Sequence, residues 1–235
     1  MSTLGTDYES AKADSRRHLC EALRGAFSTS YVTLVSIIQG AALSYLFTVI
    51  DSVIPDAHGR QGFVEWTLIV TAVLIIVAVW NEYVMGVTVF DWVPTLLDAA
   101  IPFAIGIVEY AFMRAIHEAA PVRSALVAFA TLWTLGVAGF VNMYWRASSQ
   151  RRNRFVIAAL GAFPHLNSIG CAVVAVLSGL AATMAPSRTP SVFLLLMPAV
   201  LVAYLAKSAA YWNRLRVWSG ATDDPRRSDA GAKNV

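Results

Sequence analysis

Four charged side chains interrupt long apolar stretches of this sequence: Glu82, Asp98, Glu109 and Lys207. A charge is costly in lipid, so such residues commonly mark ion or substrate paths, proton relays or buried ion pairs. Asp98 and Glu109 are eleven residues apart. In a helix they lie nearly in line, roughly 16 Å apart along the axis. Two carboxylates on one helix face indicate a polar cavity or a cation path.

A structural interpretation of the two carboxylates stays open beside this one. Asp98 follows the predicted start of its helix, where the helix dipole favours a negative charge. Glu109 could pair with Arg114 or Arg123 near the opposite end of the same span. In either case the carboxylates would stabilise the bundle and would not form part of an ion path.

Uncharged polar residues also fall inside the apolar stretches. Gln39, His165 and Asn167 are predicted near the membrane midplane, and Asn81 and Asn142 in the inner leaflet. His165 could relay protons, because imidazole changes its charge near neutral pH. It could equally be a hydrogen-bond partner between helices. The Pro164-His165 pair is predicted to kink its helix.

The elements that position these residues are transmembrane helices. The 235 residues are 57% hydrophobic and 14% charged, with a mean hydropathy of +0.58. About 20 apolar residues cross a bilayer. Six apolar runs meet this length, at about 27–50, 64–88, 94–116, 122–146, 155–183 and 191–213. The sequence therefore predicts an all-α polytopic membrane protein, a bundle of six transmembrane helices without a separate soluble domain.

The distribution of basic residues predicts the orientation of the bundle, because cytoplasmic loops are rich in Lys and Arg. With six spans and a cytoplasmic N-terminus, thirteen basic residues lie on the cytoplasmic side: Lys12, Arg16, Arg17, Arg24, Arg146, Arg151, Arg152, Arg154, Arg214, Arg216, Arg226, Arg227 and Lys233. Four lie outside: Arg60, Arg114, Arg123 and Arg188. We therefore predict that both termini are cytoplasmic, in a multi-pass protein of a bacterial plasma membrane.

This topology places Glu82, Asp98 and Lys207 at a similar depth, towards the cytoplasmic ends of their helices. Lys207 belongs to neither group and is left inside the last predicted span. An ion pair between Lys207 and either Asp98 or Glu82 would offset part of the cost of burying both charges. We expect such a structural pair.

Two polar segments are predicted to flank the membrane domain of residues 27–218. Residues 1–26 form a cytoplasmic amphipathic segment, with a basic helix at about residues 6–25 that lies against the headgroups, and residues 219–235 form a disordered cytoplasmic tail. The basic segments face anionic lipid, so the net charge of +3 does not require nucleic acid as a partner. No cleavable signal peptide is predicted, and the first span directs its own insertion.

Enzymatic and metal chemistry find little support in the sequence. Cys20 and Cys171 are predicted at different depths, so no disulfide framework is expected. We find no zinc-protease motif, phosphate-binding glycine loop or nucleophile elbow. We expect no catalytic activity, no cofactor and no metal site. In the first span, Thr33, Ser36, Gly40 and Ser44 form a small-residue face that permits close helix packing within or between subunits, and a homo-oligomer is expected.

Short patches of the first half resemble small prokaryotic six-helix potassium channels. They are Arg24-Gly25-Ala26-Phe27-Ser28 at the start of the first span, Trp80-Asn81 in the second and Ile101-Pro102-Phe103 in the third. The sequence departs from that family where Thr29 replaces the Asp of its Phe-Ser-Asp motif, and where Asn81-Glu82 replaces Asn-His. The resemblance implies that first helices assemble around a pore, with Leu34 and Ile38 as its apolar constriction.

The leading functional hypothesis is permeation of an ion, with a cation expected, or of a small solute. A carrier would alternate access around Gln39, His165 and Asn167, whereas a channel would assemble through its first helices. The alternative is a non-conducting membrane sensor or scaffold, whose basic segments bind lipid or a cytoplasmic partner. Loss of flux on mutation of the intramembrane acids would distinguish the two classes.

Overall fold

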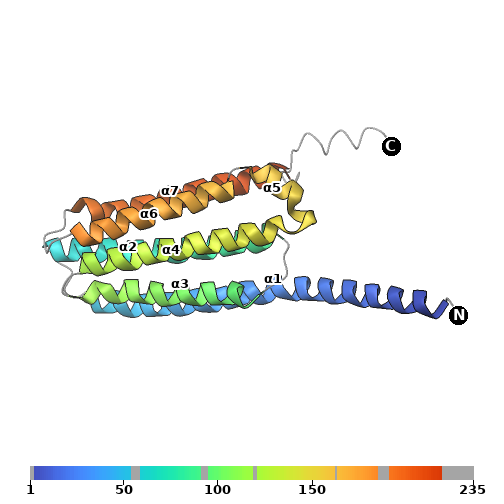
Figure 1. The fold of residues 1–235 in the computed structure, drawn as a ribbon. Coiled ribbons are helices and arrows are strands. Elements are labelled where there is room, and N and C mark those ends of the chain that lie inside the picture. Colours follow the sequence, from blue (N-terminus) through green and yellow to red (C-terminus); the bar gives the residue numbers. More distant parts are fainter. Residues whose placement is uncertain are drawn as a thin grey trace, which may run out of the picture.

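The computed structural model describes residues 3–53, 59–90, 95–118, 121–161, 163–184 and 191–218. These residues form helices joined by short connections and include no strand, which confirms the all-α prediction. The helices are α1 (Thr3–Val53), α2 (Gly59–Val89), α3 (Leu96–Arg114), the 3-10 turn η2 (Ala115–His117), α4 (Pro121–Ser148), the 3-10 turn η3 (Arg151–Asn153), α5 (Arg154–Leu160), α6 (Phe163–Met184) and α7 (Ser191–Trp218). Figure 1 shows the long helices side by side in one bundle.

Within the described residues, six segments are long and apolar enough to cross a membrane, which agrees with the predicted number of spans. They are Thr29–Val53, Gln61–Val89, Leu96–His117, Pro121–Ser148, His165–Met184 and Phe193–Val217. Many large apolar side chains on the outside of the bundle are exposed, as expected for a surface that contacts lipid. The protein is therefore a multi-pass integral membrane protein.

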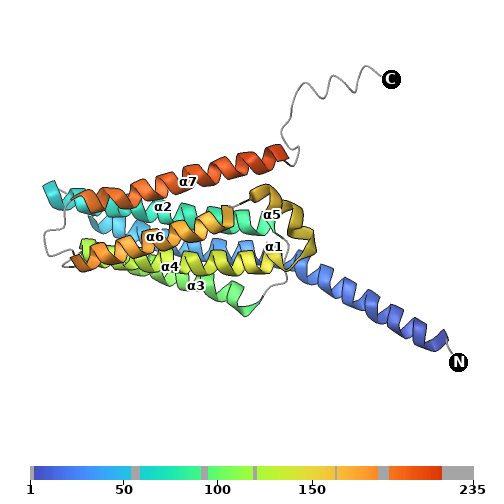
Figure 2. The same ribbon diagram turned by 45° about the horizontal axis from the view of Figure 1, so that its top comes forward.

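Three segments rich in Lys and Arg lie at one end of the bundle. The N-terminal part of α1, the connection from α4 to α5 and the end of α7 all lie on the same side (Figures 1 and 2). An even number of spans requires this arrangement, and the distribution of Lys and Arg predicts that this end is cytoplasmic. We call it the basic end.

The N-terminal segment and the first span form one helix. α1 runs from Thr3 to Val53 without a break, and its first half extends beyond the bundle in both ribbon views (Figures 1 and 2). The predicted boundary between residues 26 and 27 is therefore not marked by a change in backbone conformation. The predicted tail, residues 219–235, lies outside the described residues.

The fifth apolar run differs from the prediction of one continuous span with a kink at Pro164-His165. The chain breaks earlier, at Gly161, whose φ of 61° is readily adopted only by glycine. The short helix α5 precedes the break, and Leu160 packs with Met85, Phe90 and Ala147 at the basic end. The span itself begins at His165. Hydropathy missed the break because both sides of it are apolar.

Helices α1 and α3 make a close contact that depends on a glycine. A methyl group added at Gly106 would lie 2.5 Å from Cγ2 of Ile38, well inside van der Waals contact. Ile38 is branched at Cβ and has few alternative rotamers, so it cannot easily move away. The close packing of this pair therefore requires glycine at position 106.

We expect Gly106→Ala to destabilise the protein by about 1–3 kcal/mol, the usual cost of overpacking a tight contact. The measurement is the thermal unfolding midpoint of the purified protein in detergent. Gly40→Ala is the matched control on α1, where an added Cβ would meet no atom within 4 Å. The double variant Gly106→Ala/Ile38→Ala should recover part of the loss, and equal midpoints for Gly106→Ala and Gly40→Ala would contradict this account of the contact.

Candidate functional site

A cavity of about 120 Å³ lies inside the bundle, with walls from α1, α2, α3, α4, α6 and α7. Most of its lining is apolar. The lining residues with a polar or ionisable group are Tyr31, Glu82, Tyr83, Asp98, Trp133, Asn142, Cys171 and Tyr204. Of the residues singled out in the sequence, Glu82, Asp98 and Asn142 are brought together here. The aromatic residues of the wall were not predicted as site residues.

Glycines make room for the cavity. Gly86 of α2 and Gly136 and Gly139 of α4 belong to its lining. A Cβ added at Gly139 would meet Ile101 at 3.8 Å, and one at Gly136 would meet Cys171 at 3.4 Å. These positions therefore lie in ordinary contact with neighbouring helices, and their missing side chains leave space that larger residues would occupy.

Asp98 is fixed at the first turn of α3. Its Oδ2 accepts hydrogen bonds from the backbone N–H of Thr95 at 2.7 Å and from the Thr95 hydroxyl at 2.8 Å, while Oδ1 accepts from Nδ2 of Asn142 at 2.8 Å. Nη2 of Arg146 donates to Oγ1 of Thr95 at 2.8 Å. Asp98 is only 4% exposed. It stands at the positive end of its helix, as the structural interpretation expected.

The contact between Asn142 and Asp98 joins α4 to α3, so its removal has a predictable cost. Asn142→Ala would leave Oδ1 of Asp98 buried without this donor. We expect a loss of about 1–3 kcal/mol in the free energy of unfolding. Chemical denaturation in mixed micelles would measure it, with Asn213→Ala, an exposed site on α7, as the control. Equal free energies of unfolding for the two variants would show that the hydrogen bond between Asn142 and Asp98 does not stabilise the fold.

Glu82 faces α7. It interacts with the hydroxyl groups of Tyr204 and Ser208 and with the charge of Lys207. Among the described residues, its Oε1 has no hydrogen-bond partner. Ser208 in turn accepts a hydrogen bond from Nδ2 of Asn81 at 2.7 Å, which holds the hydroxyl in place. Of the two acids proposed to pair with Lys207, the structure thus places Glu82 beside it.

Lys207 does not belong to the cavity lining. Its Nζ donates to Oδ1 of Asn167 on α6, and Asn167 is only 2% exposed. The lysine thereby connects α6 to α7 while its charge acts on Glu82. Lys207, which lies outside the lining, thus offsets part of the negative charge of Glu82.

A second polar contact lies farther along α3. Nε2 of Gln39 donates to Oε2 of Glu109 at 3.1 Å, and both residues are buried, with 5% and 2% of their surface exposed. The partner of Glu109 is therefore Gln39 of α1 and not Arg114 or Arg123, which are both exposed. Oε1 of each residue has no hydrogen-bond partner among the described residues.

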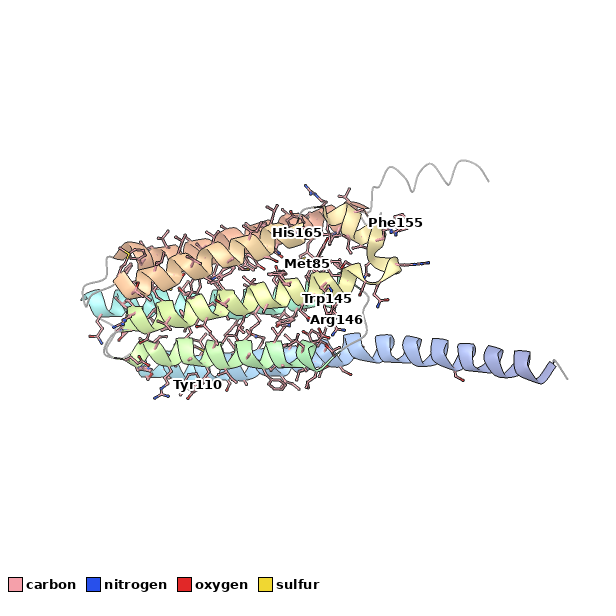
Figure 3. The ribbon with its side chains drawn as sticks, in the orientation of Figure 1. Met85, Tyr110, Trp145, Arg146, Phe155 and His165 are labelled. Carbon is pink, nitrogen blue, oxygen red and sulfur yellow. The ribbon has the colours of Figure 1, made fainter. Side chains whose placement is uncertain are left out.

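His165 lies at the start of its span and not in its middle, where the sequence had suggested it. It is the first residue of its span and is exposed, with its ring 4.5 Å from that of Tyr144. Figure 3 shows it near the basic end. Asn167 follows within a turn, so it too lies nearer that end than predicted. The break at Gly161 explains both errors, because it shortens the span from its N-terminal side.

Leu34 and Ile38 are both half-buried on α1. Neither lines the cavity, and Ile38 packs against Gly106 within the same chain. Their role in a pore between subunits stays a prediction.

No family model, curated protein or solved structure matches this chain. Within the described residues, no group of three or more His, Cys, Asp or Glu side chains is placed to hold a metal ion. The chemistry of the cavity is therefore interpreted from its own geometry.

Proposed function

We propose that this integral membrane protein moves a cation, or a small positively charged solute, across the membrane by way of the cavity between its helices. One observation supports the proposal above the others. Two carboxylates, Glu82 and Asp98, line the cavity, and no described lining residue is a lysine or an arginine. A negative cavity in a low-dielectric wall attracts positive charge and repels anions.

The two carboxylates would contribute differently. Both oxygens of Asp98 accept hydrogen bonds from Thr95 and Asn142, so its charge is distributed into the protein. Oε1 of Glu82 is buried and has no such donor among the described residues. A buried carboxylate oxygen without a donor is costly, and a bound cation would relieve that cost. Glu82 is therefore the group expected to contact the cation.

Gln39 and Glu109 extend the same path along α3. Ile101 and Ile105 line the cavity beyond Asp98, and Glu109 follows one turn farther on. A cation that left the cavity in this direction would meet two oxygens without donors, Oε1 of Gln39 and Oε1 of Glu109. Acidic and amide groups at two depths suit a stepwise passage better than one isolated site.

Reconstitution tests the proposal. Liposomes with the full-length protein should take up potassium, sodium, protons or an organic cation faster than empty liposomes under an imposed gradient. Asp98→Asn and Glu109→Gln should each reduce that uptake while the protein keeps its helical spectrum and its elution volume. A folded protein that moves none of these cations under any gradient would contradict the proposal.

A second function, as a membrane sensor or scaffold, is favoured by a different observation. The first half of α1 extends beyond the bundle at the basic end, where it can reach a partner or anionic lipid (Figure 1). In this alternative the intramembrane acids only stabilise the fold. Their variants would then change unfolding midpoints and leave flux at the level of empty liposomes.

A further inference from the structure

We infer that the cavity binds a compact organic cation, a protonated or quaternary amine of the size of tert-butylammonium, with Glu82 as its counter-charge and aromatic rings as its walls. This deepens the proposed function, and it rests on the same cavity. It makes a distinction that the proposed function leaves open, between a weakly hydrated organic cation and an alkali metal ion.

The walls are rich in aromatic rings. Tyr31, Tyr83, Trp133, Phe140 and Tyr204 come from α1, α2, α4 and α7 and all line the cavity. The rings of Trp133 and Tyr204 meet edge to face with centroids 5.3 Å apart, and those of Tyr31 and Tyr83 with centroids 5.6 Å apart. Ring faces attract ammonium groups, and the attraction is strongest where water is excluded. Sites for quaternary amines are commonly built from such rings.

An alkali metal ion finds too few oxygen atoms here. A potassium site replaces the hydration shell with several carbonyl or carboxylate oxygens. In this cavity, both oxygens of Asp98 are already hydrogen-bonded, and the one other carboxylate among the described lining residues is that of Glu82. Most of the remaining wall is apolar, with Ile75, Leu132 and Leu201 among its residues. The charge of a compact organic cation needs one counter-charge and its methyl groups need apolar contact, and the wall supplies both.

The size of the cavity is also suitable. Its volume is about 120 Å³. An engineered cavity of about 150 Å³ in another protein binds benzene, so a slightly smaller cavity suits a compact molecule such as tert-butylammonium. Larger drug-like cations would need the helices to separate. The volume of the cavity therefore limits the size of the cation that can bind, which the charge of Glu82 alone would not do.

Glu82 is positioned to hold the ammonium group. The hydroxyl groups of Tyr204 and Ser208 interact with its carboxylate, and Ser208 accepts a hydrogen bond from Nδ2 of Asn81. Lys207 acts on the same carboxylate from outside the lining and donates to Asn167. Glu82 itself lines the cavity, so its carboxylate can act as the counter-charge of a ligand bound there.

The test compares a cation with a neutral molecule of nearly the same shape. Tert-butylammonium and tert-butanol are titrated separately into the full-length protein in lipid nanodiscs, and binding is followed by saturation-transfer NMR. We expect the ammonium to bind saturably and the alcohol about tenfold more weakly or not at all. Excess potassium should not displace the ammonium.

Variants locate the binding to this cavity. Glu82→Gln and Trp133→Leu should each weaken binding of the ammonium about tenfold. Glu65→Gln is the matched control: it makes the same change on α2 at a buried acid that accepts a hydrogen bond from Gln61 and does not line the cavity. It should bind as the wild type does. The comparison of ammonium with alcohol on the wild type needs no variant, so it decides the matter even if a variant fails to fold.

The outcomes separate the two proposals. Equal binding of the alcohol and the ammonium, or wild-type affinity in Glu82→Gln, would overturn the inference. Potassium or sodium flux without any ammonium binding would also overturn it and would leave the proposed function standing. Ammonium binding that depends on Glu82, in a protein that moves no cation, would support the inference and contradict the proposed function.

Discussion

Cation uptake by proteoliposomes is expected to fall about tenfold or more when Glu82 is replaced by glutamine. The substitution keeps the shape of the side chain and removes its charge. Glutamine can still bond to Tyr204 and Ser208, so the contact between α2 and α7 should survive. What is lost is the counter-charge that makes a cation in the apolar cavity favourable. Initial uptake rates under a fixed gradient measure the effect.

The control for this prediction is Glu65→Gln, an identical change on the same helix away from the cavity. It should keep the wild-type rate. Both proteins should elute as the wild type does and show the same helical spectrum. Undiminished uptake by folded Glu82→Gln would mean that cations do not use this carboxylate, and the path would have to be sought elsewhere.

Filling the cavity is expected to stop uptake almost completely. Ala78 of α2 lines the cavity and is 5% exposed, so Ala78→Leu would add three carbon atoms to a space of about 120 Å³. Space that is already empty accepts this volume at a modest cost, about 1–3 kcal/mol at most if neighbours must move. The protein should therefore fold, while the cation loses its site. Uptake should approach the rate of empty liposomes.

Ala203→Leu is the matched control for the filled cavity, because Ala203 is exposed on α7 and an added side chain there would face lipid. Its uptake should equal that of the wild type. If Ala78→Leu folds and transports at the wild-type rate, the cavity is not on the path. Loss of uptake in both variants would point to a general effect of larger side chains and not to the cavity.

Hydropathy and charge were sufficient to predict the architecture. Six apolar runs of the required length leave little freedom in a chain of 235 residues, and the part of the chain that the structure describes contains six candidate spans. The position of Asp98 was also predictable, because a carboxylate three residues after Thr95 is typical of a helix start. Both predictions depend on local sequence and on the thickness of the bilayer.

Contacts between helices were not predictable in the same way. The pairing of Glu109 with Gln39 depends on the rotation of α1 against α3, which the close approach at Gly106 permits. Hydropathy carries no information on that rotation. The arginines near Glu109 in sequence were therefore the wrong partners, although the residue itself was correctly singled out.

The cavity was missed for a related reason. Tyr83, Trp133 and Tyr204 are aromatic residues in apolar runs, where most such residues simply pack in a core or lie at an interface. The space between them exists because Gly136 and Gly139 of α4 face it. Small residues that lie opposite aromatic residues on other helices would indicate such a cavity. This pattern can be recognised only once it is known which helices are neighbours.

The position of a bound cation tests the central claim most directly. Crystals of the full-length protein would be soaked in turn with tetramethylarsonium, an organic cation with an anomalous scatterer, and with thallium(I), a stand-in for potassium. The account predicts an arsenic peak in the cavity beside Glu82, within about 6 Å of the rings of Trp133 and Tyr204, and no thallium peak there. The soaks would use cation concentrations at which the protein shows transport. If both cations then give peaks only outside the cavity, the account is contradicted.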